Sequence, residues 1–154
     1  MPYYTADASA VWFTQHSGAD GSTASIHKID VHGATDTVAV DTLGVLDYYP
    51  IRDTLGQFLY TRSLSSTSLF DQVYMFDGAK SVSLLFNTPD ADYSDAYPVD
   101  SQYVVLSSTK AGGQGGYDLY IADRTSGAVW PMNSYNSGVN TNREELGASY
   151  TPVN

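Results

Sequence analysis

Residues 115–123 read GGYDLYIAD: two glycines, a run of apolar and aromatic side chains, and a closing aspartate. Tyr, Ile and Leu suit a pleated surface, whereas Gly and Asp are typical of turns, so this stretch is predicted to be a strand between two turns. Weaker copies of its second half occur at residues 26–30 (IHKID) and 73–77 (VYMFD). The closing aspartates are 47 (77 − 30) and 46 (123 − 77) residues apart. A nearly constant interval indicates a repeat architecture.

Three further strand patterns accompany each copy. A tyrosine-containing stretch opens each unit, with Tyr4, Tyr49, Tyr97 and Tyr150 placed in register. A second strand follows at residues 11–14, 58–61 and 104–107, and a fourth at residues 38–42, 84–88 and 129–134. No segment sustains a 3.6-residue period, so helix is expected at most as a turn at 142–145.

Units of about 45 residues with four strands are typical of β-propeller blades. The sequence therefore predicts an all-β chain, a half-propeller of three four-stranded antiparallel blades. We place the blades at about residues 3–46, 47–92 and 93–145, and residues 146–154 as the first strand of a further blade.

The third unit carries the pattern most clearly, with YPVD at 97–100, LSST at 106–109 and then GGYDLYIAD. It resembles the WD-like repeat of TolB-type β-propellers, and the resemblance covers essentially the whole chain. Tyr stands where that family has Trp, and Arg52-Asp53 replaces its Asp-Gly turn. The resemblance implies a propeller fold in a family that includes periplasmic interaction proteins, cell-surface propellers and some polysaccharide lyases.

Composition narrows the classes of function. The 154 residues suit one domain, and the formal net charge of −10 disfavours nucleic acid and anionic membranes as partners. There is no cysteine, which excludes disulfides and thiol chemistry. No apolar run is long enough to span a membrane.

Location and assembly are further expectations. Low charge content with abundant Ser, Thr, Gly, Asp and Tyr is common in exported bacterial proteins, so we expect a secreted, periplasmic or cell-surface protein whose targeting signal lies outside this chain. Three blades leave two open ends. Either the chain belongs to a larger propeller, or two copies form a six-bladed ring; we favour the second.

In a propeller, the loops entering the first strand and leaving the second open on one face near the central channel. These loops bring together mixed charges and aromatic rings, which suit a ligand or partner surface. The candidate ligand-binding residues are His16, Asp47, Tyr48, Arg62, Tyr93, Asp95, Arg143 and Glu145. A solvated loop is the alternative for His16.

Three loops need separate interpretation. Asp90, Asp92 and Asp95 supply enough oxygen ligands for calcium, although a solvated acidic loop is the alternative; no other cofactor is expected. The glycine-rich residues 112–116 lack the Lys-Ser/Thr of a phosphate-binding loop and predict a flexible connection. The insertion at 135–145 is either a contact element or a hydrogen-bonded spacer.

Two function classes remain. The first is a non-enzymatic module that binds a partner or assembles with itself, since no GxSxG, HExxH or Cys-based motif is present. The alternative is a carbohydrate-active propeller, binding a glycan or acting as a polysaccharide lyase at its central channel. There tyrosines would stack on sugars, Arg62 or Arg143 would hold a uronate, and His16 with a tyrosine would abstract a proton.

Overall fold

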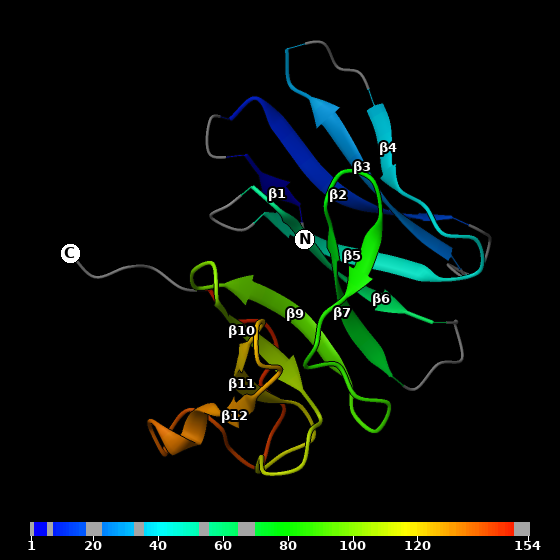
Figure 1. Cartoon of the computed structure of the whole chain (residues 1–154). Coiled ribbons are helices and arrows are strands. Elements are labelled where there is room, and N and C mark those ends of the chain that lie inside the picture. Colours follow the sequence, from blue (N-terminus) through cyan, green and yellow to red (C-terminus); the bar gives the residue numbers. More distant parts are fainter. Residues whose placement is uncertain are drawn as a thin grey trace.

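The computed structural model describes residues 2–5, 8–17, 23–32, 36–52, 56–64 and 70–149 (Figure 1). These residues form β1 (Tyr3–Tyr4), β2 (Ala10–Ser17), β3 (Thr23–Asp30), β4 (Asp36–Val40), β5 (Leu46–Arg52), β6 (Phe58–Ser63), β7 (Asp71–Phe76), β8 (Ser81–Ser83), β9 (Tyr93–Pro98), β10 (Tyr103–Ser108), β11 (Asp118–Asp123) and β12 (Val129–Pro131). The predicted all-β class is confirmed.

One short 3-10 helix is described, at Met132–Ser134, and not at 142–145. Local side-chain bonds explain the difference. The Thr141 hydroxyl lies 2.6 Å from Glu145 Oε1 and accepts a hydrogen bond from the Arg143 N–H. Side chains that capture nearby backbone groups in this way compete with a helical turn.

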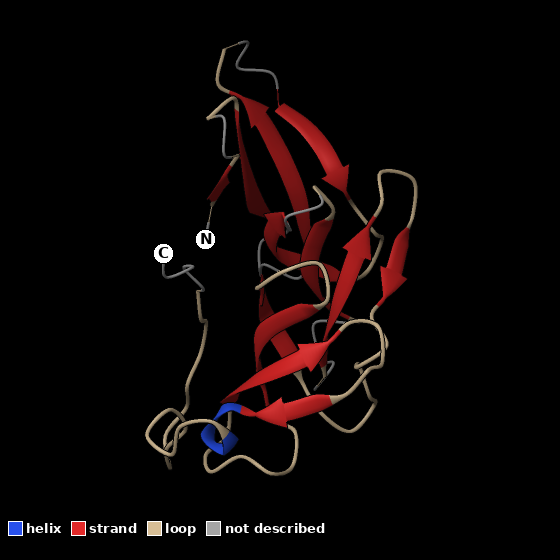
Figure 2. Ribbon diagram, turned by 60° about the vertical axis from the view of Figure 1, so that its left-hand side comes forward, coloured by secondary structure: helices blue, strands red, loops and turns tan. Residues whose placement is uncertain are grey.

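The strands follow one another as three antiparallel units of four: unit 1 (β1–β4), unit 2 (β5–β8) and unit 3 (β9–β12). A single parallel pairing, Ala24 with Leu46, joins units 1 and 2 into one sheet, whereas unit 3 forms a sheet of its own. The units succeed one another along the molecule in the order of the chain, and strands account for nearly all its regular structure (Figures 1 and 2).

Strand register relates the units to one another. Ile51 pairs with Leu59 in unit 2 as Tyr97 pairs with Val105 in unit 3, an offset of 46 residues (97 − 51). The equivalent of Tyr49 is therefore Asp95, and the alignment of Tyr49 with Tyr97 was wrong by two residues. A two-residue shift leaves every side chain on the same face of the strand, so alternation in the sequence does not reveal it.

Two apolar layers hold the units together. Between units 1 and 2 lie Trp12, Ile26, Val40, Phe58 and Tyr60, with the Trp12 and Phe58 ring centroids 4.5 Å apart. Between units 2 and 3 lie Leu59, Val73, Leu84, Phe86, Ala91, Tyr93, Ala96, Val104, Leu106, Tyr120 and Ala122. Successive side chains of β6 thus face unit 1 and unit 3 in turn, and β6 is buried along its whole length.

In units 2 and 3, an asparagine side chain binds the backbone N–H and carbonyl of one residue in the third strand, as a neighbouring strand would. The Asn87 amide accepts from the Val73 N–H at 3.0 Å and donates to the Val73 carbonyl. Asn140 does the same for Leu119, at 2.9 and 3.0 Å. Helix 132–134 and the turn after it lengthen the path from β12 to Asn140. The insertion therefore contains a hydrogen-bonded spacer, one of the two interpretations left open.

Replacing Asn140 by alanine is expected to cost about 1–3 kcal/mol, because it leaves the partly buried N–H and carbonyl of Leu119 without this partner. Asn140 is only 1% exposed, so water does not readily replace it. Urea unfolding should show the loss, and amide hydrogen exchange should show faster exchange at Leu119. Unchanged exchange at Leu119 would contradict this role.

Candidate functional site

The first strand of units 2 and 3, which we call the inner strand of its unit, makes the same hydrogen bond to the preceding unit: a backbone N–H donates to a threonine hydroxyl. The Tyr49 N–H donates to Thr14 Oγ1 and the Asp95 N–H to Thr61 Oγ1, each at 3.3 Å. Tyr49 and Asp95 have φ of 53° and 52°, and β5 and β9 both show a register shift there. An irregular residue thus turns each inner strand toward its neighbour.

Residues 146–149 lie in the corresponding place beyond unit 3. The Gly147 N–H donates to Ser107 Oγ at 2.9 Å, and Gly147 has a φ of 69°. Ser107 is the equivalent of Thr61, since Ser107 pairs with Leu119 as Thr61 pairs with Val73. Residues 146–149 are not in a strand, and 150–154, including Tyr150, lie outside the described residues. The first strand of a further blade stays a prediction.

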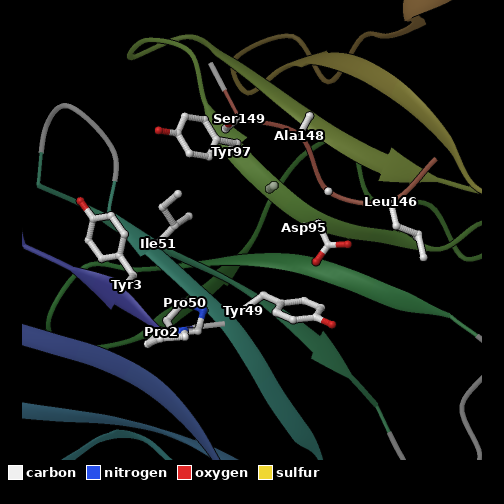
Figure 3. A pocket seen from close by; sticks show the side chains of 12 residues that line it. Pro2, Tyr3, Tyr49, Pro50, Ile51, Asp95, Tyr97, Leu146, Ala148 and Ser149 are labelled. Atoms are coloured by element: carbon white, nitrogen blue, oxygen red, sulfur yellow. The ribbon is translucent and has the colours of Figure 1, made fainter. Parts of the chain in front are cut away.

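Residues of β1, β5 and β9, with Pro2 and residues 146–149, line a groove of about 530 Å³ (Figure 3). The register arranges its walls in levels: Tyr49, Asp95 and Gly147 form one, and Tyr3, Ile51, Tyr97 and Ser149 form another two residues further along. Pro2, Pro50, Ala96 and Ala148 lie between the two levels, and Leu146 adjoins Gly147. Figure 3 shows Asp95, Tyr49 and Leu146 near one end and Tyr3, Ile51 and Tyr97 near the other.

Among the described residues that line the groove, Asp95 is the one that carries a charge. Burial and the nearby Asp71 raise the pKa of the Asp95 carboxyl. Burial, Asp95 and Asp71 likewise raise the pKa of Tyr49. Burial and a hydrogen bond to Asp71 raise the pKa of Tyr48, which lies beside the same carboxylates. The carboxylates of Asp95 and Asp71 thus lie near each other at this end of the groove.

The two terminal units each present an open sheet face. Register places Val11, Phe13, Ile29 and Val38 on the outer face of unit 1, together with His27. Val105, Leu119, Ile121 and Trp130 share the outer face of unit 3. Val38 and Trp130 are 53% and 39% exposed, whereas His27 and Val105 are each only 7% exposed. We call these two surfaces the unit 1 open face and the unit 3 open face.

Asp47 and Arg62, two predicted ligand-binding residues, bind each other. Arg62 Nε donates to Asp47 Oδ1 at 2.7 Å and Nη2 to Oδ2 at 3.0 Å, while Nη2 also donates to Thr42 in the connection between units 1 and 2. The guanidinium lies over the Tyr60 and Tyr74 rings. Burial raises the pKa of Asp47 and Arg62 opposes that shift. Because Asp47 is buried and Arg62 is only 9% exposed, neither is presented to a ligand as the sequence led us to expect.

The other predicted residues are scattered. Tyr93 is buried in the core with its hydroxyl 2.8 Å from Thr88 Oγ1, so its side chain is not exposed on the surface where the sequence led us to expect it. His16 is exposed on β2, and Arg143 is exposed in the loop where Glu145 accepts from Thr141. Of the eight predicted ligand-binding residues, Asp95 alone lines the groove. The groove residues Tyr3, Ile51 and Tyr97 were missed, since finding them required the corrected register.

The predicted calcium ligands do not converge. Asp90 is exposed, Asp92 accepts from the Asp71 N–H at 2.6 Å, and Asp95 faces the groove. Within the described ranges no three His, Cys, Asp or Glu side chains form a group able to hold a metal ion. The structure therefore offers no support for a calcium ion at these residues.

One polar cluster was not anticipated. Ser25 Oγ lies 3.0 Å from His27 Nε2, and His27 Nδ1 lies 2.9 Å from Asp36 Oδ1. This order is that of an acyl-transfer triad, but such chemistry also needs hydrogen-bond donors aimed at an oxyanion. Ser25 lies within β3 and not on a turn that would supply them. The cluster orients the imidazole on the unit 1 open face, against the Phe13 ring.

Neither a family model nor a curated protein matches the chain by sequence. Its fold does match solved structures. TolB from Acinetobacter baumannii is 18% identical with a TM-score of 0.63, over 85% of this chain and 31% of that one. A putative TolB from Agrobacterium tumefaciens is 14% identical with a TM-score of 0.66, over 96% and 55%. A puromycin-hydrolyzing peptidase from Mycobacterium tuberculosis is 13% identical with a TM-score of 0.59, over 96% and 21%.

The fold is that of a partial β-propeller. At these identities the likeness concerns fold alone, and the chain spans less than two thirds of each of these proteins. Among the described residues no helix is long and apolar enough to cross a membrane.

Proposed function

We propose that the chain is a three-bladed assembly module of TolB-like type that closes into a six-bladed ring with a second copy. The observation that carries the proposal is the pair of open faces. An apolar sheet face exposed to water favours burial against another surface, and each half-covered blade leaves one such face.

The two open faces match the faces already in contact inside the chain. Val11, Phe13, His27 and Ile29 on the unit 1 open face lie 47 residues before Phe58, Tyr60, Tyr74 and Phe76, which pack toward unit 1. Val105, Leu119 and Ile121 on the unit 3 open face lie 46 residues after Leu59, Val73 and Met75, which pack toward unit 3.

A head-to-tail contact between two copies would therefore repeat the internal blade contact. Two such contacts, related by a two-fold axis, close three and three blades into one ring and leave neither face exposed. Closure removes the apolar surface and the sheet ends that would otherwise favour uncontrolled association.

We expect light scattering on a sizing column to give twice the 16.7 kDa chain mass, independent of loading over a wide range. Phe13→Glu and Ile121→Glu, one on each open face, should each shift the mass to that of a single chain. A buried carboxylate without a partner opposes association by several kcal/mol.

Leu43→Glu is the matched control, since Leu43 is 98% exposed in a loop and lies on neither face. It should leave the mass unchanged. A wild-type chain of single mass at all concentrations would refute self-assembly and favour a propeller completed by other blades. Circular dichroism should confirm that the two face variants remain folded.

The carbohydrate-active alternative has less support. Arg62 is bound to Asp47, and His16 lies outside the groove. A glycan array would test it directly, with binding to a neutral or acidic polysaccharide as the result in its favour. Export from a bacterial cell remains part of the proposal and is tested by fractionation of the source organism.

A further inference from the structure

The groove has one polar end and one apolar end. Its levels lie two residues apart along the strands, roughly 6–7 Å. Asp95 belongs to the first level, whereas Tyr3, Ile51 and Tyr97 supply aromatic and aliphatic surface at the second. A volume of about 530 Å³ is within the range of pockets that hold small organic molecules.

The one charged side chain among the described residues that line the groove, Asp95, is acidic. No lysine or arginine is among the described residues that line it, and Asp71 lies close enough to Asp95 to disfavour its ionisation. Arg52 acts on Tyr3 electrostatically but lies over the Trp12 ring, 5.6 Å from its centroid, and does not line the groove. The Asp95 N–H bonds to Thr61, which fixes the backbone from which the carboxylate projects.

We propose that the groove binds a small organic cation, with its ammonium group against Asp95 and its apolar body against Tyr3, Ile51 and Tyr97. A partly buried carboxylate gains most from a ligand that brings the opposite charge. Tyrosine faces such as that of Tyr49 beside Asp95 also attract an ammonium group. An anionic ligand would meet both Asp95 and Asp71, and a neutral one would leave the carboxylate partly desolvated, with its Ser94 hydrogen bond but without an opposite charge from the ligand.

The levels also set the size of a probe. An ammonium group at Asp95 and an aromatic ring at the second level require a linker of a few methylene groups, as in 4-phenylbutylamine. Its neutral analogue, 4-phenyl-1-butanol, and its anionic analogue, 4-phenylbutyrate, have nearly the same shape. The three compounds thus differ mainly in charge.

Isothermal titration calorimetry at pH 7 and low salt should detect the amine with a submillimolar Kd, and the alcohol and acid at least about tenfold more weakly. Backbone amide shifts should place the amine at Tyr49, Ile51 and residues 95–97. Equal affinity for amine and alcohol, or no amine binding at millimolar concentration, would overturn the proposal.

Asp95→Asn should weaken amine binding about tenfold or more and leave binding of the alcohol unchanged. Asn tolerates the left-handed conformation of residue 95, so this variant keeps the local backbone. Asp41→Asn removes the same charge from an exposed position outside the groove and should leave amine binding intact. Loss of affinity in both variants alike would refute a specific role for Asp95. The result does not depend on self-association, which the solution mass tests separately.

Discussion

Asp47→Ala is expected to lower the free energy of unfolding by about 3–5 kcal/mol, the largest effect of any single substitution considered. The variant leaves the Arg62 guanidinium buried over two tyrosine rings, with the Thr42 hydroxyl but without its carboxylate. Asp47 and Arg62 face each other across β5 and β6, and Thr42 belongs to the connection from unit 1. Loss of the carboxylate therefore weakens the contact between units as well as unit 2 itself. Urea unfolding followed by tyrosine fluorescence measures the change.

Two controls separate an unpaired charge from simple loss of contacts. Asp47→Leu combined with Arg62→Met should recover most of the stability, because apolar side chains of similar volume can replace a buried ion pair. Asp36→Ala breaks the hydrogen bond between His27 Nδ1 and the Asp36 carboxylate, a side chain that is 49% exposed, and should cost less than about 1 kcal/mol. An Asp47→Ala cost as small as that of Asp36→Ala would mean that water reaches the Arg62 site.

Gly115→Ala should destabilise the protein by about 2–4 kcal/mol. A Cβ atom on Gly115 would lie 1.8 Å from the Arg143 carbonyl oxygen and 3.1 Å from that of Thr141. Both obstacles are backbone, so no side-chain rotation relieves them. The loop at 141–145 must move, and the hydrogen bond from the Glu145 N–H to the Tyr117 carbonyl breaks with it. Urea unfolding and faster amide exchange at Glu145 would record both effects.

Gly138→Ala is the matched control, since its added Cβ would meet only Asn136 Oδ1 at 3.5 Å, an ordinary contact. It should change stability by less than about 1 kcal/mol. Equal effects of the two alanines would contradict the close approach at Gly115. The glycine-rich residues 112–116, predicted to be a flexible connection, are thus packed against a later loop. The Asp118 carboxylate also accepts from the Gln114 and Gly115 N–H groups.

The groove shows how much of a candidate site the repeat spacing of the sequence could predict. Asp95 was selected because it opens a unit, and it does line the groove. Tyr93, two residues earlier, was selected for the same reason but is buried in the core. Residues 93 and 95 of a regular strand would share a face, but the irregularity at Asp95, with its positive φ, separates their surroundings. The alternation of apolar and polar residues in the sequence does not reveal such an irregularity.

The sequence by itself determined the class of fold and the order of the strands, because alternating apolar residues between turn formers specify strands locally, and a repeat of 46 or 47 residues specifies equal units. Only the tertiary structure decided which polar residues are available. Arg62 and Asp47 lie on adjacent strands and neutralise each other, whereas Asp95 lines the groove with no lysine or arginine among the described lining residues. Pairing of charges depends on contacts between strands. A burial pattern with a two-residue period fixes the face on which each side chain lies, but not which residue of the adjacent strand lies beside it.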